Sequence, residues 1–143
     1  ERKELVLFPL LRKETKESYI QLSTKKLTVQ NYDFEFETFK KETNFEFSTS
    51  KLLAHLDKDK LNFPLSIRTW QEGDEFFPLG MKGRKKKLSD FFINQKIPLH
   101  LKKEVLILCS GKDIVWILGY RLDERFKLSS KTETIFSISV STK

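Results

Sequence analysis

The fold of this chain is decided by one stretch, Val105-Leu106-Ile107-Leu108-Cys109-Ser110-Gly111-Lys112-Asp113-Ile114-Val115-Trp116-Ile117-Leu118. Two continuous apolar runs flank a short polar segment that contains a glycine. Each run is too short for a typical helix and is rich in β-branched or aromatic residues. The stretch therefore predicts a buried β-hairpin that turns at Ser110 to Asp113.

Alternation of apolar and polar residues predicts further strands. Phe34 and Phe36 alternate with acidic residues, Phe45 and Phe47 flank Glu46, and shorter candidates lie at 19–22 and 27–29. Strands with one apolar face and one solvent-exposed face are typical of a β meander. A last alternating run at 135–140 predicts a strand at the edge of a sheet or capping it, whereas 51–61 fits a helical face and a turn equally well.

A glycine-rich and proline-rich segment separates these strand candidates. Residues 71–87 contain Gly73, Pro78, Gly80 and Gly83, so we expect mostly turns and loop there. One short helix should follow, capped by Ser89 and with Phe91, Phe92 and Ile93 toward the core, since Leu88 and Ile93 have the spacing of a hydrophobic staple. Pro98 prevents its continuation.

The charge of the chain is concentrated in its second half. Residues 1–65 carry 12 Lys and Arg against 11 Asp and Glu, whereas residues 66–143 carry 15 against 9, for a net charge of +7. Lys82, Arg84, Lys85, Lys86 and Lys87 place five cations in six positions. Such a segment attracts phosphates, although a charge run is also common in solvated loops.

Residue types that carry chemistry are sparse. His55 and His100 lack a second His or Cys at ligand spacing, and Cys109 is the lone cysteine, so we expect no metal site and no internal disulfide. Ser110-Gly111-Lys112-Asp113 is similar to the start of a pyrophosphate loop, but a strand follows where such a loop needs a helix. Asp123 and Glu124, between Arg121 and Arg125, predict a structural ion-pair cluster. No catalytic residues are predicted.

The lengths of the apolar segments and the identity of the first residue indicate the cellular location that we expect for the protein. No apolar run approaches the roughly 18 residues of a membrane span, and there is no signal-peptide pattern. The chain begins with Glu1 rather than Met. We expect a cytoplasmic fragment of a longer protein, with no membrane contact.

Residues 66–128 contain a series of short motifs in a fixed order: Ile67-Arg68 with Gly73-Asp74, Phe77-Pro78-Leu79-Gly80, the basic segment 82–87, Leu88-Ser89-Asp90-Phe91-Phe92-Ile93, Lys96-Ile97-Pro98, and Ile114-Val115-Trp116 followed by Gly119 and Arg121. In order and spacing, these motifs strongly resemble the C-terminal domain of bacterial tRNA(Ile)-lysidine synthetases. Each element alone is weak, whereas the ordered set is specific.

The resemblance implies both a fold and a role. The fold is α+β and mainly β, a small β-sandwich-like domain with short peripheral helices, related to a domain of the phenylalanyl-tRNA synthetase β subunit. The chain would be a single C-terminal region over 1–143, with a β-rich lead-in at 1–62 and a tRNA-binding core at 63–143. It would itself be non-catalytic and would grip the acceptor stem.

The resemblance also implies partners. They are tRNA(Ile) with a CAU anticodon and the N-terminal catalytic domain of the same enzyme, a ligase that uses ATP and lysine to modify cytidine 34. This chain needs no cofactor of its own. The candidate RNA-binding residues are Lys82, Arg84, Lys85, Lys86 and Lys87, with Arg68, Lys96 and Arg121 as neighbours. Trp70, Phe76 and Phe77 are either rings that stack on an unpaired base or, as is more common for aromatic side chains, part of the buried core. The alternative is a protein-interaction or dimerisation domain in which the basic segment only aids solubility.

Overall fold

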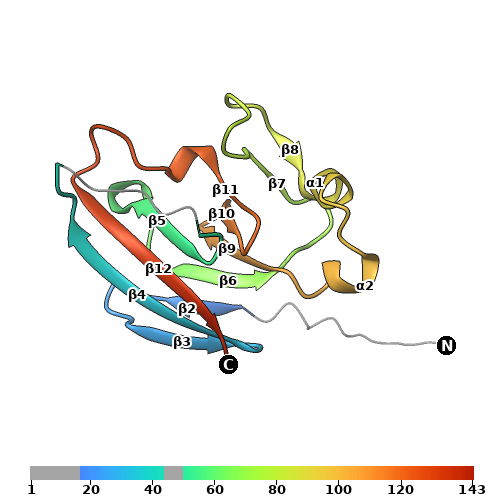
Figure 1. Ribbon diagram of the computed structural model, residues 1–143, viewed down its shortest axis with the longest axis horizontal. Coiled ribbons are helices and arrows are strands. Elements are labelled where there is room, and N and C mark those ends of the chain that lie inside the picture. The colour runs from blue at the N-terminus through green and yellow to red at the C-terminus, as the bar shows by residue number, and fades with distance from the viewer. Residues whose placement is uncertain (1–16, 44–49) are drawn as a thin grey trace.

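The computed structural model describes residues 17–43 and 50–143, which form three stacked layers (Figure 1). A four-stranded antiparallel sheet packs on a five-stranded antiparallel sheet, and the short helix α1 (Leu88–Asn94) with a two-stranded ribbon covers the outer face of the second sheet. The second short helix, α2 (Leu99–Lys102), follows α1 and buries none of its residues. The expected class, α+β and mainly β, is confirmed. No helix among the described residues is long and apolar enough to cross a membrane.

The predicted hairpin forms the centre of the five-stranded sheet. β9 (Leu106–Ser110) pairs with β10 (Asp113–Ile117), and Ser110 faces Asp113 across the turn. Gly111 has a φ of +62° there, a conformation that glycine adopts without steric cost. The strand order is β11 (Arg121–Leu122), β10, β9, β6 (Leu65–Thr69) and β2 (Ser18–Ile20).

Both faces of this hairpin are buried, which explains why its sequence does not alternate. Leu106 and Leu108 pack toward the four-stranded sheet, whereas Ile107 and Cys109 pack toward the helices. In β10 the register shifts between Ile114 and Trp116, a β-bulge that lets the consecutive residues Val115 and Trp116 join the same core.

The four-stranded sheet has the order β3 (Lys26–Val29), β4 (Tyr32–Lys40), β12 (Thr134–Thr142) and β5 (Leu53–Asp57). The expected edge position of the last strand is wrong, because β12 pairs with β4 on one side and β5 on the other. The segment left open at 51–61 is β5 followed by the 3-10 turn η2 (Lys58–Lys60). The expected strand around Phe45 and Phe47 lies outside the described residues.

The sandwich core lies between the two sheets. Its aromatic centre comes from the four-stranded sheet, where Phe36 stacks on Phe34 and Phe136, with ring centroids 6.2 and 5.9 Å apart. Leu65, Ile67, Leu106 and Leu108 of the other sheet join the same cluster. At roughly 1.5 to 3 kcal/mol for each fully buried large side chain, this interface is the main source of stability.

The outer layer contains α1 (Leu88–Asn94), α2 (Leu99–Lys102) and the ribbon of β7 (Glu75–Phe76) and β8 (Lys86–Lys87). Ser89 does not cap α1, because the helix already begins at Leu88 with Lys87 at the N-cap and no side-chain cap bond. Phe91 and Phe92 are buried as expected, but Ile93 is 70% exposed. A seven-residue helix buries only one stripe, and Ile93 falls outside it. The second helix, α2, was not expected from the sequence.

Candidate nucleic-acid interface

The basic segment lies on an excursion of the chain between β7 and β8. Its base is fixed: the Leu79 N–H donates to the Leu122 carbonyl at 2.9 Å, and Pro78 forms a β-bridge with Asp123. Its tip turns through three positive φ angles, +92° at Gly80, +54° at Lys82 and +82° at Gly83. Two glycines therefore make the turn, and the chain returns into β8 and α1.

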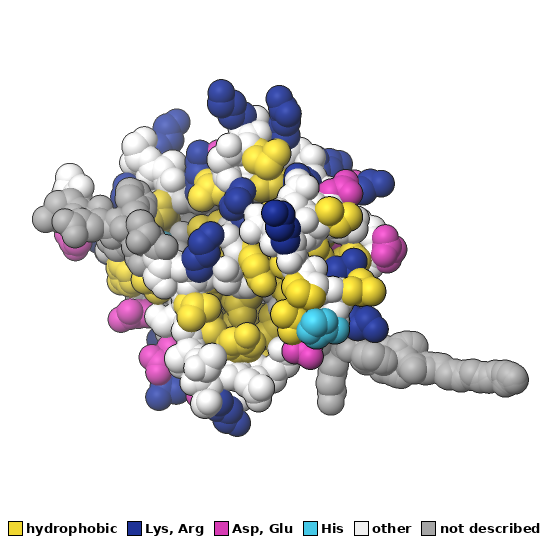
Figure 2. All heavy atoms as spheres, turned by 45° about the vertical axis from the view of Figure 1, so that its right-hand side comes forward, with side chains coloured by type: hydrophobic (Ala, Val, Ile, Leu, Met, Phe, Trp, Pro, Cys, Tyr) yellow, Lys and Arg dark blue, Asp and Glu magenta, His cyan; other side chains and the backbone are white. Residues whose placement is uncertain are grey.

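The cations of this segment differ in their surroundings. Lys82, Arg84 and Lys87 are exposed and, in the part of the chain that the structure describes, have no carboxylate at ion-pair distance. Lys85 lies 3.6 Å from a Glu75 carboxylate oxygen, and Lys86 is half-buried in β8. Figure 2, which brings the side with α1, α2 and β8 forward, shows Lys and Arg side chains crowded above an apolar patch. This surface is suited to a polyanion.

The three neighbouring cations are placed differently. Arg68 donates to both carboxylate oxygens of Asp74, at 2.9 and 3.0 Å, and its side chain is only 11% exposed. Arg121 donates to the Leu79 carbonyl at 3.3 Å, at the base of the basic segment. Lys96 is exposed just after α1. The structure thus brings Arg121 to the basic segment and commits the Arg68 guanidinium to an internal ion pair.

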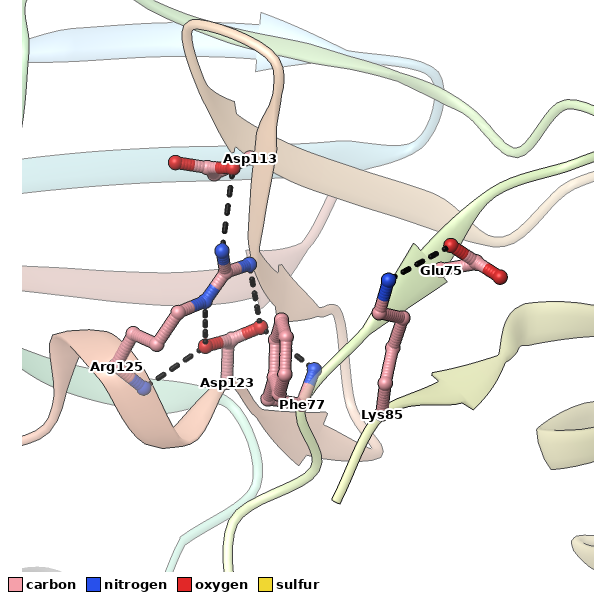
Figure 3. Close-up of polar contacts among 6 residues, drawn as sticks. All are labelled: Glu75, Phe77, Lys85, Asp113, Asp123 and Arg125. Atoms are coloured by element: carbon pink, nitrogen blue, oxygen red, sulfur yellow. Dashed lines mark hydrogen bonds and ion pairs between the residues drawn. The ribbon is translucent and has the colours of Figure 1, made fainter. Parts of the chain in front are cut away.

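The expected ion-pair cluster around Asp123 and Glu124 is present (Figure 3). Arg125 donates from Nε to Asp123 Oδ1 and from Nη2 to Asp123 Oδ2, both at 3.0 Å, and from Nη1 to Asp113 at 3.2 Å. Lys127 forms a short contact with Glu124, and its hydrogen bond lowers the pKa of that carboxyl. These acids are held in pairs, as a structural role requires.

The three aromatic candidates for stacking differ in how accessible their rings are. Phe76 is fully buried in the core under α1, so of the two alternatives for this ring the core position is the observed one and the ring is not accessible to RNA. Trp70 is half-buried, with Lys102 Nζ 4.7 Å from its ring centroid and Phe92 against it edge-on. Phe77 is half-buried, and the Arg125 guanidinium lies 4.4 Å from its centroid. No pattern in the sequence predicts the contact between Phe77 and Arg125, because 48 positions separate these two residues.

The segments that form this surface are similar in sequence to known proteins. The profile of the family described as "TilS substrate C-terminal domain" matches residues 65–140. The tRNA(Ile)-lysidine synthase of Parabacteroides distasonis is 39% identical over 129 residues, 90% of this chain and 29% of that protein. That of Clostridium tetani is 44% identical over 88 residues, 62% of this chain and 19% of that protein.

A solved structure shares the fold. The crystal structure of a TILS C-terminal domain superposes with a TM-score of 0.73 at 21% identity, and the match covers 89% of this chain and 98% of that one. This chain spans less than a third of the length of the two synthases above.

Proposed function

This chain belongs to the family of TilS substrate C-terminal domains, and on that premise we propose that it is the RNA-binding C-terminal domain of a tRNA(Ile)-lysidine synthase. The domain binds tRNA(Ile) with a CAU anticodon through the acceptor stem. The catalytic region of the same cytoplasmic enzyme uses ATP and lysine to modify cytidine 34. The domain presents the substrate to that region and contributes no catalytic group.

One observation carries this proposal: the family match spans the whole basic excursion, and the excursion is both anchored and exposed. Affinity for duplex RNA comes mainly from neutralising phosphates, and A-form RNA is read largely by shape and backbone. Lys82, Arg84 and Lys87 project from a base held by backbone hydrogen bonds, so several cations reach one backbone together.

The test is replacement of Lys85, Lys86 and Lys87 together by Ala, with tRNA binding measured across salt concentration. Each lost phosphate contact lowers the slope of log affinity against log salt by about 0.7 to 0.9, so contacts from all three lysines correspond to a decrease of roughly two to three units. The exposed Lys87 accounts for about one unit, whereas Lys85 must first leave Glu75 and Lys86 is half-buried. The loss should be similar for different tRNAs, because lysines aimed at the backbone do not read bases.

A matched control removes the same charge elsewhere. Lys25, Lys26 and Lys131 are exposed on or beside the four-stranded sheet, and their triple Ala variant should keep the wild-type slope. If the two triple variants behave alike, or if the salt slope of the first is unchanged, the basic segment is only a solvated loop. Sedimentation of the chain as a stable dimer that does not bind tRNA would favour the alternative, a protein-interaction domain.

A further inference from the structure

A polar hollow lies beside the basic segment, between the ribbon of β7 and β8 and the hairpin turn at Gly111. Its volume is about 300 Å³, at the lower end of the range of small-molecule sites. Three cations and three acids line it, together with one aromatic ring: Lys85, Lys112, Arg125, Asp74, Glu75, Asp113 and Phe77. Balanced charge does not favour a free anion, but it supplies hydrogen-bond donors and acceptors around a ring.

The Phe77 ring is held rigidly in this hollow. The Phe77 N–H donates to the Asp123 carboxylate at 2.9 Å, and the Phe77 carbonyl accepts from the Glu124 N–H at 2.6 Å. One side of the ring is taken by the Arg125 guanidinium, which Asp123 and Asp113 fix in place. A ring fixed at backbone and side chain loses little entropy when a ligand stacks on it.

The other side of the ring is closed only loosely. In Figure 3 the Phe77 ring lies between Arg125 and Lys85. Lys85 Nζ is 5.9 Å from the ring centroid, and its ion pair with Glu75 joins side chains that are 54% and 42% exposed. Exposed pairs of this kind contribute at most about 1 kcal/mol, so a ligand displaces Lys85 at small cost.

We propose that this hollow binds one unpaired nucleotide of the RNA, with its base stacked on the face of Phe77 that Lys85 now shields. Lys85 then moves from Glu75 to the phosphate of that nucleotide. The freed carboxylate of Glu75, with Asp113, accepts hydrogen bonds from exocyclic amino groups, which favours cytosine, adenine or guanine over uracil. The inference rests on the proposed function and adds a single-stranded subsite to it.

The test compares two RNAs on the wild-type 143-residue chain. One is a short blunt RNA duplex, and the other is the same duplex with one unpaired cytidine at a 3′ end. Stacking on an aromatic ring should raise affinity for the second RNA by about 5- to 140-fold. An abasic 3′ nucleotide, which keeps the phosphate, should lose most of this gain, and uridine should retain less of it than cytidine.

Variants test whether Phe77 is responsible for the gain in affinity. Phe77→Leu should bind both RNAs equally, with the affinity that wild type has for the blunt duplex, whereas Phe77→Tyr should keep the gain. Phe39→Leu removes a half-buried ring from the four-stranded sheet and should also keep it. Equal binding of the blunt, extended and abasic RNAs by wild type would overturn this inference alone and leave the proposed function standing. Failure to bind any of them would overturn both.

Discussion

The Asp123 carboxylate joins Phe77, at the start of the basic excursion, to Arg125, and the variant Asp123→Asn isolates the contribution of this carboxylate. The carboxylate is fully buried. Oδ1 accepts from the Arg125 backbone N–H at 2.8 Å and from Arg125 Nε at 3.0 Å, and Oδ2 accepts from Arg125 Nη2 at 3.0 Å and the Phe77 N–H at 2.9 Å. An asparagine of the same shape must turn its NH2 toward one of these two pairs of donors.

The size of the effect follows from this geometry. Two of four hydrogen bonds are lost whichever way the amide lies, and each was charge-assisted. Either way one backbone N–H is left without its acceptor, which costs about 1 to 3 kcal/mol. The Arg125 guanidinium also loses one bond, but its side chain is 36% exposed, so water replaces part of that bond. For a domain of this length, a loss of about 1 to 3 kcal/mol is roughly 3 to 12 °C in Tm, out of a total stability of about 5 to 15 kcal/mol.

The assay is urea unfolding and thermal melting of Asp123→Asn beside Asp113→Asn. Asp113 contacts the same guanidinium at 3.2 Å, but its side chain is 55% exposed, so its loss should cost less than about 1 kcal/mol. Equal, small losses in the two variants would refute the reasoning, because burial would then not distinguish the two acids.

Two further predictions concern titratable groups. Burial raises the pKa of the Cys109 thiol to about 11, so in the native protein it should react with Ellman's reagent at pH 8 only as fast as the chain unfolds, and fast labelling without unfolding would contradict this. Burial lowers the pKa of His55, so proton uptake on unfolding should reduce the unfolding free energy as pH falls below about 6.5, its ordinary value. His55→Gln should flatten that dependence in urea titrations between about pH 6.5 and 5, and an unchanged pH profile would show that other groups dominate.

The local parts of the fold could be predicted from the sequence. The hairpin is predictable because residues 105–118 consist of two apolar, β-branched runs around a glycine turn. The ion pair is predictable because Asp123 and Arg125 are only two positions apart. The position of β12 was not predictable, because an alternating run looks the same at an edge and between two partners. The strands on either side of it come from residues 32–40 and 53–57. The relation to the phenylalanyl-tRNA synthetase β subunit stays a prediction.

The candidate site, like the fold, could be predicted from the sequence only in part. The basic segment was visible as a charge run, and its exposure follows from the glycines that turn it. The sequence does not indicate which ring is accessible, because Phe76 and Phe77 are adjacent and only strand parity decides which of them is buried. Phe76 points into the core under α1, and Phe77 points to Arg125. Ser89 failed as a cap because the ribbon strand β8 runs directly into the helix.

The central place of β12 also sets the order of events on the ribosome. The edges of β4 and β5 that it covers are synthesised well before it: 85 positions separate Asp57 from Thr142. At about 5 to 20 residues per second, the edge of β5 waits roughly 4 to 17 s for this partner, and the edge of β4, which is made earlier, waits longer. During this interval their unpaired N–H and C=O groups are open to other nascent chains. The four-stranded sheet is thus closed late, by insertion of a strand between two that are already made.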